Sequence, residues 1–344
     1  MGLREYIIRR IILLIPVVFG AVILVFAITQ MIPPASRAYL YIRSEKDIQK
    51  ISEFIKAYHL DASPLEQFYY WFQEVLKGNL GWSTEGRAPV LSVIRTSWPA
   101  TIEIVLFSAP ITILLGIYLG VLSAVHRDKL VDHATRLFSI TGYSLPAFWL
   151  ALILLSIAFS LTGENITGRV SPELQNVVTN SLIFKTYTGL YTIDGILNGR
   201  LDVTIDALKH LILPVITITT VNVAGLIRLM RSSMLEALTK GYIVTAKAKG
   251  LKNSQVINKH ARRNALIPVV TMSGMLVIWM LSGLVITETI FNFGGLGSWA
   301  ARCALRLDIA SVVGFTLFTA LLFVISNLVI DILYAYIDPR IRLG

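Results

Sequence analysis

The chain has 344 residues, of which 55% are hydrophobic and 15% charged, and its mean hydropathy is +0.67. These values exclude an ordinary soluble domain of this length and indicate a protein of the lipid bilayer. The net charge of +10 does not indicate nucleic-acid binding, because the basic residues flank apolar segments and form no stripe on a soluble domain. The single cysteine, Cys303, excludes an internal disulfide bond and a zinc site built from cysteines.

Six charge-free segments are long enough to cross a membrane, since about 20 apolar residues span roughly 30 Å of hydrocarbon. They predict membrane-spanning helices over residues 11–32, 104–125, 137–162, 211–227, 265–287 and 309–330, with Pro146 interrupting the third. Arg4, Arg9 and Arg10 precede the first segment, and because cytoplasmic flanks collect Lys and Arg, we expect the N-terminus in the cytoplasm. That segment is too long for a signal-peptide core, so we expect residues 1–32 to be a retained anchor.

The region after the anchor has nearly balanced charges and is predicted to be an extracytoplasmic subdomain over residues 33–97. Within it, Pro64 begins a helical apolar pattern that ends before Gly78. The aromatic residues 69–72, together with Trp82, are interpreted as membrane-interface residues, and ligand binding is the alternative.

Two further polar regions are predicted outside the spans. Residues 126–133 form a short charged cytoplasmic turn, whose His126, Asp132 and His133 are interpreted as solvated residues, because neighbouring helical residues do not face one metal. Residues 163–207 are rich in glycine and predict a second outside loop with short ordered pieces. Six crossings return the C-terminal residues 336–344 to the cytoplasm.

The most basic segment lies between the fourth and fifth spans. Residues 228–263 hold nine Lys or Arg and one acid, Glu236, which predicts a cytoplasmic position. Inside it, Gly241 and Gly250 frame a helix of about two and a half turns, which is too short to be stable in water without a partner surface. Gly250 suits the left-handed residue that ends a helix, and Asn253 or Ser254 is expected to cap the next one.

This short helix predicts a docking element. Tyr242, Ala246 and Lys249 share one of its faces, and Ile243, Ala246 and Gly250 share an adjoining one. One aromatic anchor among small side chains suits insertion into a cleft of another protein. A basic helix lying on anionic lipid would satisfy the same pattern, so periodicity alone leaves both partners open.

Short motifs occur along the chain in a fixed order and spacing. They are Arg9-Arg10 with Pro16, Leu60-Asp61, Gly78-Asn79-Leu80-Gly81, residues 97–103, residues 145–150, residues 245–251, His260, residues 263–268, residues 288–291, residues 295–297, residues 331–335 and Asp338-Pro339-Arg340. In these motifs the chain resembles the ABC importer permeases, and more narrowly the oligopeptide/dipeptide/nickel permease family. Residues 245–268 resemble the EAA-type cytoplasmic loop of that family.

The resemblance implies an all-α polytopic membrane protein, a type I ABC importer permease whose six transmembrane helices carry an extracytoplasmic insertion after the first. It implies a transmembrane core over residues 98–335 with a coupling loop at about residues 232–264. The implied ATPase-coupling helix consists of Gly241, Tyr242, Ile243, Thr245, Ala246, Lys247, Ala248, Lys249 and Gly250, supported by His260, Asn264 and Pro268.

The partners that the resemblance implies are a second homologous permease subunit, two cytoplasmic ABC ATPase subunits and an extracytoplasmic solute-binding protein in the cell membrane. The chain has no Walker-type phosphate loop, so ATP and Mg are expected on the ATPase subunits and no cofactor or metal on this chain. The sequence departs from the family pattern at Gly241 and Val244, where acids are expected, and at Gly294, where a proline is expected.

Peptides are the solutes that the resemblance implies, with nickel or oligosaccharides as alternatives. A self-sufficient channel or ion-coupled transporter is the alternative from a different class, but such proteins place ionisable residues within their spans. An intramembrane hydrolase is a third hypothesis, and the five histidines lie outside the predicted spans. We therefore expect a non-catalytic transport subunit.

Overall fold

The structure is a computed structural model that describes residues 3–180 and 182–337. The predicted tail lies outside the described residues from Asp338 onward. The helices are α1 (Leu3–Thr29), α2 (Pro34–Arg37), η1 (Ala38–Leu40), η2 (Glu45–Lys50), α3 (Ile51–Ala57), α4 (Pro64–Leu76), α5 (Val90–Val125), α6 (Leu130–Ser144), α7 (Ala147–Thr162), α8 (Pro172–Thr179), α9 (Tyr191–Leu197), α10 (Leu201–Thr239), α11 (Gly241–Ala248), α12 (Asn253–Gln255), η3 (Val256–Ala261), α13 (Arg262–Leu281), α14 (Val285–Ile290), α15 (Leu296–Leu305) and α16 (Ile309–Ile337). Strands β1 (Trp82–Ser83) and β2 (Ala88–Pro89) form one antiparallel pair, with Trp82 opposite Pro89.

The described residues confirm a mostly helical membrane protein. Five helices are long and apolar enough to cross a bilayer, and the pair α6 and α7 makes up to six if it counts as one span. That pair is bent by 100°, which confirms the predicted interruption of the third segment at Pro146. Pro146 causes the break, because proline disfavours helical geometry in the residue before it and Leu145 is extended.

Other predicted boundaries also shift. The second predicted span forms part of a longer helix, α5, which begins at Val90. The fourth span belongs to α10, which extends from Leu201 to Thr239 and takes in the end of the predicted outside loop. The fifth ends at Leu281 and not at residue 287, because Gly283 adopts φ 118° between α13 and α14.

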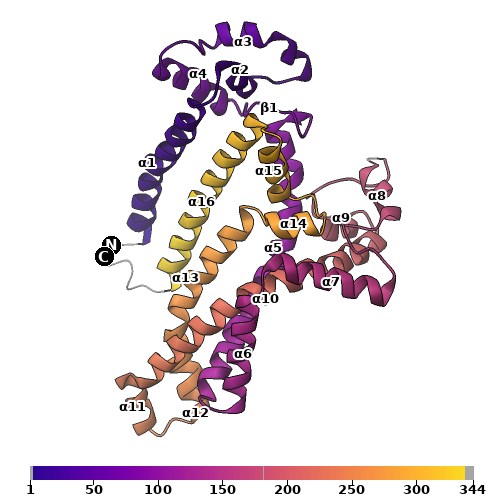
Figure 1. Ribbon diagram of the computed structural model, residues 1–344. Helices are drawn as coiled ribbons and strands as arrows, with labels where there is room; N and C mark the ends of the chain where they lie inside the picture. The colour runs from indigo at the N-terminus through magenta and orange to yellow at the C-terminus, as the bar shows by residue number, and fades with distance from the viewer. Residues whose placement is uncertain (1–2, 181, 338–344) are drawn as a thin grey trace. The chain divides into compact units, whose positions relative to one another are not determined.

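By its internal contacts the chain forms two compact units, the first made of residues 1–101, 282–285 and 294–344. In this unit α1 packs along α16, and η1, α3 and α4 lie together beyond the end of α1 (Figure 1). The core of the unit includes Phe26, Tyr41, Trp71 and Trp299, all buried. The helix α4 forms as predicted, since Ser63 accepts a hydrogen bond from the Glu66 backbone and a proline occupies its first turn.

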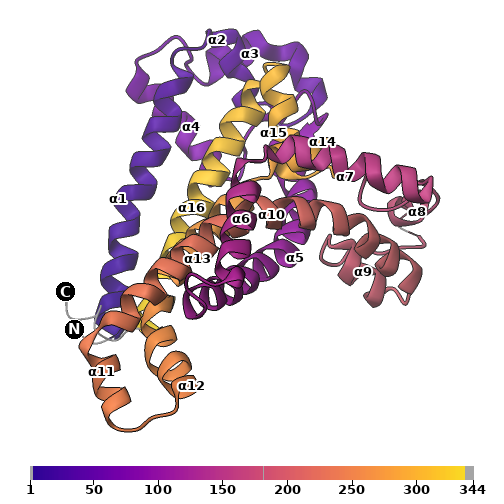
Figure 2. The same ribbon diagram turned by 60° about the horizontal axis from the view of Figure 1, so that its bottom comes forward.

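The second unit consists of residues 102–281 and 286–293. The long helix α10 is its centre and contacts α6, α7, α9 and α13. Its close approach to α5 depends on Gly120, where an added Cβ would lie 2.5 Å from Met230 Cβ and 2.9 Å from the Ile227 carbonyl oxygen. Within this unit, α11 and α12 lie together at one end of the α10–α13 pair (Figure 2).

Candidate functional site

The short helix predicted between Gly241 and Gly250 is present as α11, Gly241–Ala248. Only Lys240, which is extended, separates α11 from the end of α10. On its other side α11 contacts the segment η3, which continues directly into α13. The helix α11 is therefore joined to α10 by a single residue and packs on the segment that leads into α13.

The end of α11 has the geometry that its glycine predicts. Gly250 adopts φ 77°, a left-handed conformation that favours glycine. Its N–H donates to the Lys247 carbonyl at 2.9 Å, and the Leu251 N–H donates to the Ala246 carbonyl at 3.3 Å. This pair of bonds is a Schellman motif, so the helix ends without unpaired carbonyls at these positions. The N-cap position of the next helix is Lys252, so the prediction that Asn253 or Ser254 caps this helix is wrong.

One face of α11 is turned into the protein. Ile243 and Ala246 are buried in a cluster with Met234, Val256 and Ala261. The predicted docking face of Tyr242, Ala246 and Lys249 is therefore divided: Ala246 contacts its own chain, whereas Tyr242 is 39% exposed and Lys249 is also exposed. The other exposed residues between positions 241 and 250 are Gly241, Val244, Thr245, Lys247, Ala248 and Gly250.

The supporting residues lie on the return segment. His260 is in η3, which has π-helical geometry, and Asn264 and Pro268 are in the first two turns of α13. The Asn264 side chain donates to the His260 carbonyl at 2.8 Å. Pro268 has no N–H for the Asn264 carbonyl, which loosens the backbone bonding in this turn. The structure thus brings His260 and Asn264 together, and both Asn264 and Pro268 are exposed.

A buried ion pair between Asp132 of α6 and Arg231 of α10 was not predicted from the sequence. The Asp132 side chain is 0% exposed, and its two oxygens accept hydrogen bonds from Arg231 Nε and Nη2, both at 2.8 Å. The Ser123 hydroxyl donates to Asp132 Oδ1 at 2.5 Å, and the Asp128 N–H donates to Oδ2 at 3.1 Å. The interpretation of Asp132 as a solvated turn residue is wrong, because α6 already begins at Leu130 and turns this side chain toward α10.

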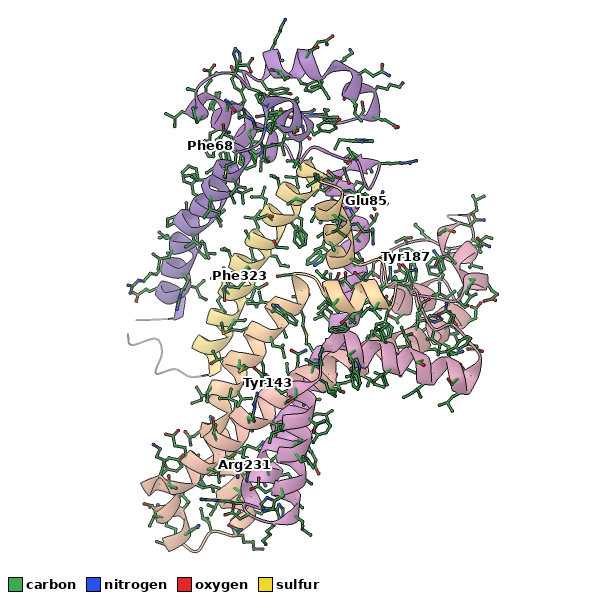
Figure 3. All side chains as sticks on the ribbon, viewed as in Figure 1. Phe68, Glu85, Tyr143, Tyr187, Arg231 and Phe323 are labelled. Carbon is green, nitrogen blue, oxygen red and sulfur yellow. The ribbon has the colours of Figure 1, made fainter. Side chains whose placement is uncertain are left out.

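This pair connects α5, the 126–133 turn and α6 to α10 (Figure 3 labels Arg231). Asp128 permits the tight turn by adopting φ 62°, a left-handed conformation that Asp tolerates better than most residues. The sequence does place an acidic residue, Asp132, just before the predicted third span and a basic residue, Arg231, just after the predicted fourth span. Nothing in the spacing of residues 99 positions apart indicated that the two would meet.

A second buried acid lies in α5. Glu103 accepts from the Thr192 N–H at 2.8 Å and from Arg169 Nη2 at 2.7 Å. Arg169 also donates to the Gly189 carbonyl at 2.6 Å and lies 3.7 Å from the centre of the Tyr191 ring. The ion pair between Glu103 and Arg169, together with the Thr192 hydrogen bond, therefore connects the region 163–200 to α5. Glu103 and Asp132 are each buried and paired with arginine, which is a packing role and not evidence of ion coupling.

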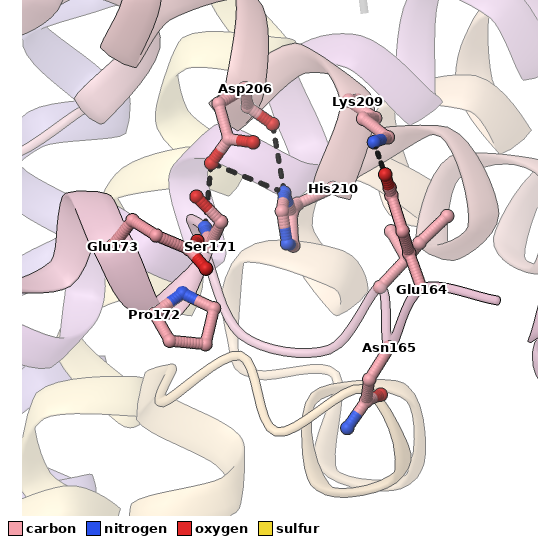
Figure 4. A pocket seen from close by; sticks show the side chains of 9 residues that line it. Glu164, Asn165, Ser171, Pro172, Glu173, Asp206, Lys209 and His210 are labelled. Carbon is pink, nitrogen blue, oxygen red and sulfur yellow. Dashed lines mark hydrogen bonds and ion pairs between the residues drawn. The ribbon is translucent and has the colours of Figure 1, made fainter. Parts of the chain in front are cut away.

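A polar pocket of about 520 Å³ lies beside the start of α10 (Figure 4). Asp206 Oδ2 accepts from the Ser171 N–H at 2.6 Å, and His210 Nδ1 lies 2.9 Å from the Asp206 carbonyl. Lys209 forms an ion pair with Glu164 at the pocket edge. The lining thus carries both signs of charge, which suits polar solutes better than apolar ones. Within residues 3–180 and 182–337, no three His, Cys, Asp or Glu side chains are grouped to hold a metal ion.

In the first unit, the buried residue Glu74 connects α4 to Arg43, which precedes the helix, and to Lys77 and Asn79, which follow it. Burial alone would raise the pKa of its carboxyl, but hydrogen bonds from Arg43, Asn79 and Lys77 outweigh burial and lower that pKa to about 2. The three donors lie 2.6 Å, 2.8 Å and 2.9 Å from the Glu74 oxygens. The aromatic residues of α4 are largely used inside the unit, since Phe68 and Trp71 pack against Phe26.

Comparison with known proteins places this architecture in a family. The profile of the binding-protein-dependent transport system inner membrane component matches residues 116–343. The chain is 37% identical over 343 residues to the dipeptide transport system permease protein DppB of Escherichia coli K12, covering 98% of both chains. It is 37% identical over 339 residues to the di/tripeptide permease DppB of Pseudomonas aeruginosa, again covering 98% of both. It is 33% identical over 341 residues to the oligopeptide permease AppB of Bacillus subtilis, covering 99% of this chain and 100% of that one.

The profile covers most of the region from α5 to the end of the chain, including α11, η3 and α13. The relatives extend the match through the anchor and the subdomain after it, so the whole chain and not one segment is shared. With five to six apolar helices in the described residues, this protein is a member of the binding-protein-dependent transport system inner membrane component family of ABC transporter permeases.

Proposed function

We propose that this chain is the membrane-spanning permease subunit of an ATP-driven importer of di- and oligopeptides. The observation that carries this proposal is identity of 33–37% over nearly the full length to permeases named for dipeptide, di/tripeptide and oligopeptide transport. In this function the chain forms half of the translocation pathway, and a second homologous permease subunit forms the other half. An extracytoplasmic binding protein delivers the peptide.

Energy enters through α11. In this proposal two ABC ATPase subunits bind ATP and Mg in the cytoplasm, and one receives the exposed face around Tyr242, Lys247 and Lys249. The buried residues Ile243 and Ala246 hold α11 to its own chain, so the helix moves together with α10 and α13. Import needs two pore states whose populations the ATPase changes, because a ligand shifts an equilibrium only through a difference in its interaction with the two states.

The proposed topology has both termini in the cytoplasm. The nine basic residues of the 228–263 region support it, since α11 and α12 lie within that region. This side is also the one on which soluble ATPase subunits meet ATP.

Reconstitution tests the proposal. The chain is inserted into liposomes with its partner permease, ATPase subunits and binding protein, and uptake of a labelled dipeptide is measured with and without ATP. We expect uptake only with ATP and all subunits, and none with a hydrolysis-inactive ATPase. Labelled nickel and an oligosaccharide serve as competing solutes. Uptake by the isolated chain, without ATPase subunits, would refute the importer and favour a self-sufficient transporter.

A further inference from the structure

A pocket of about 240 Å³ lies between α6 and α10 in the second unit and takes no part in the proposed peptide import. It is lined by Arg136, Ser139 and Ile140 of α6 and by Ile227, Arg228 and Arg231 of α10. Three arginines therefore line the pocket together with apolar residues that include Ile227, which is 1% exposed. A cavity lined by basic and apolar residues suits a ligand that is both anionic and apolar.

The positive charge of this pocket is only partly neutralised within the chain. Arg231 is paired with Asp132, whose oxygens are fully occupied. Within residues 3–180 and 182–337, no carboxylate pairs with Arg136 or Arg228. The Arg228 guanidinium lies 4.3 Å from the centre of the Tyr143 ring, which orients the charge without cancelling it. Two arginines thus remain available to an external anion.

The pocket continues into an apolar face at the edge of the bilayer. On α6, Leu137, Phe138, Ile140 and Tyr143 are 45–66% exposed. The charge-free run of α10 ends at Arg228, so these arginines lie where hydrocarbon gives way to headgroups (Figure 3 labels Tyr143 and Arg231). The side of the membrane is that of the 126–133 turn and of α11, since α6 begins at that turn and α10 ends at α11.

We infer that this pocket binds the headgroup phosphate of an anionic phospholipid, whose acyl chains lie along the exposed apolar face of α6. Arginine is suited to this role because its planar guanidinium donates two parallel hydrogen bonds to a phosphate. Basic pockets between membrane helices recognise anionic headgroups, and a phospholipid, unlike a free phosphate, can contact both the arginines and the exposed apolar side chains of α6. The bound lipid would join α6 to the part of α10 that leads to α11. This inference needs only the membrane position of the chain and not its solute.

Native mass spectrometry of the full chain with its partner subunits tests the inference. The complex is titrated with phosphatidylglycerol or phosphatidylcholine of identical acyl chains. We expect selective retention of phosphatidylglycerol, and a roughly twenty- to thirtyfold loss of that preference in the double variant Arg136→Gln, Arg228→Gln, because each interfacial arginine contributes about fivefold. The double variant Arg136→Lys, Arg228→Lys keeps the charge and should keep most of the preference.

The matched control is Arg262→Gln, Arg263→Gln, which removes two exposed charges from the same unit outside the pocket. We expect this control to retain phosphatidylglycerol like the unaltered chain. Equal retention of both lipids by the unaltered chain, or an equal loss in the control, would overturn the inference. So would loss of peptide uptake in the Gln pocket variant with lipid retention unchanged, because the pocket would then belong to the solute path. Lipid retention is measured without transport, so it stands or falls separately from the proposed import of peptides.

Discussion

The buried pair of Asp132 and Arg231 allows the sharpest test of the fold around α11. In the variant Asp132→Asn, the side chain keeps one acceptor oxygen and presents an NH₂ group where the unaltered chain has a second. Four donor groups, two of them from Arg231, now compete for one oxygen. Arg231 loses its only carboxylate partner among the described residues, with its side chain 21% exposed.

Breaking one side of a buried ion pair costs about 3–5 kcal/mol, because the remaining charge stays desolvated. Partial exposure of Arg231 places the expected cost near the lower limit, at about 3 kcal/mol. A local opening that becomes easier by this amount speeds hydrogen exchange roughly a hundredfold. We therefore expect that acceleration in the first two turns of α6 and in the last three turns of α10, measured by hydrogen–deuterium exchange of the assembled complex in nanodiscs.

Two comparisons make the test decisive. The double variant Asp132→Asn, Arg231→Gln should lose less protection than the sum of the two single variants, because the second change removes the charge that the first left unpaired. Glu236→Gln removes an acid from the same helix, where it pairs with Lys240 on an open surface, and should change exchange little. Additive losses in the double variant, or equal losses in Glu236→Gln, would refute the reasoning.

Three further outcomes are expected. Gly120→Leu should destabilise the chain by about 1–3 kcal/mol in thermal unfolding, because the new Cβ overlaps Met230. A melting temperature equal to that of the unaltered chain would contradict this packing. The contribution of Glu74 to the protection of α4 against hydrogen exchange should be fully present above the ordinary pKa of a Glu carboxyl, 4.5. It should decline as the pH falls toward 2, because the unfolded state then binds the extra proton. This decline should be absent in Glu74→Gln. Tyr242→Ala should reduce coupled ATP-dependent uptake without changing membrane insertion. Gly250→Trp should do the same, because nothing lies within 4 Å of a Cβ at that position but its φ of 77° disfavours any residue other than glycine, so the end of α11 is disturbed. Normal uptake in both variants would count against the coupling role of α11.

The amino-acid sequence by itself determined the class of this protein and the position of the short helix α11. Charge-free runs near 20 residues have no stable alternative to membrane helices, since backbone groups in lipid must bond within the chain. Gly241 and Gly250 marked the bounds of α11 to within two residues, because a left-handed position at Gly250 follows from local backbone sterics. The start of α4 at Pro64 was equally local. Motif order along the chain indicated the permease family, which the comparisons confirm.

Only the tertiary structure decided which face of α11 is available and which charges are buried. Ile243 and Ala246 look like any apolar and small residues on a short helix, and their burial depends on Met234 and Val256 from other elements. Asp132 was placed in a solvated turn because its partner lies 99 residues away, and local patterns carry no information about such a pair. The 100° break after Ser144 has the same character: a proline permits a bend, but the packing of both helix segments sets its size. Short-range sterics and hydrophobic length act within a few residues and can be read from sequence, whereas pairing and burial arise only when distant segments meet.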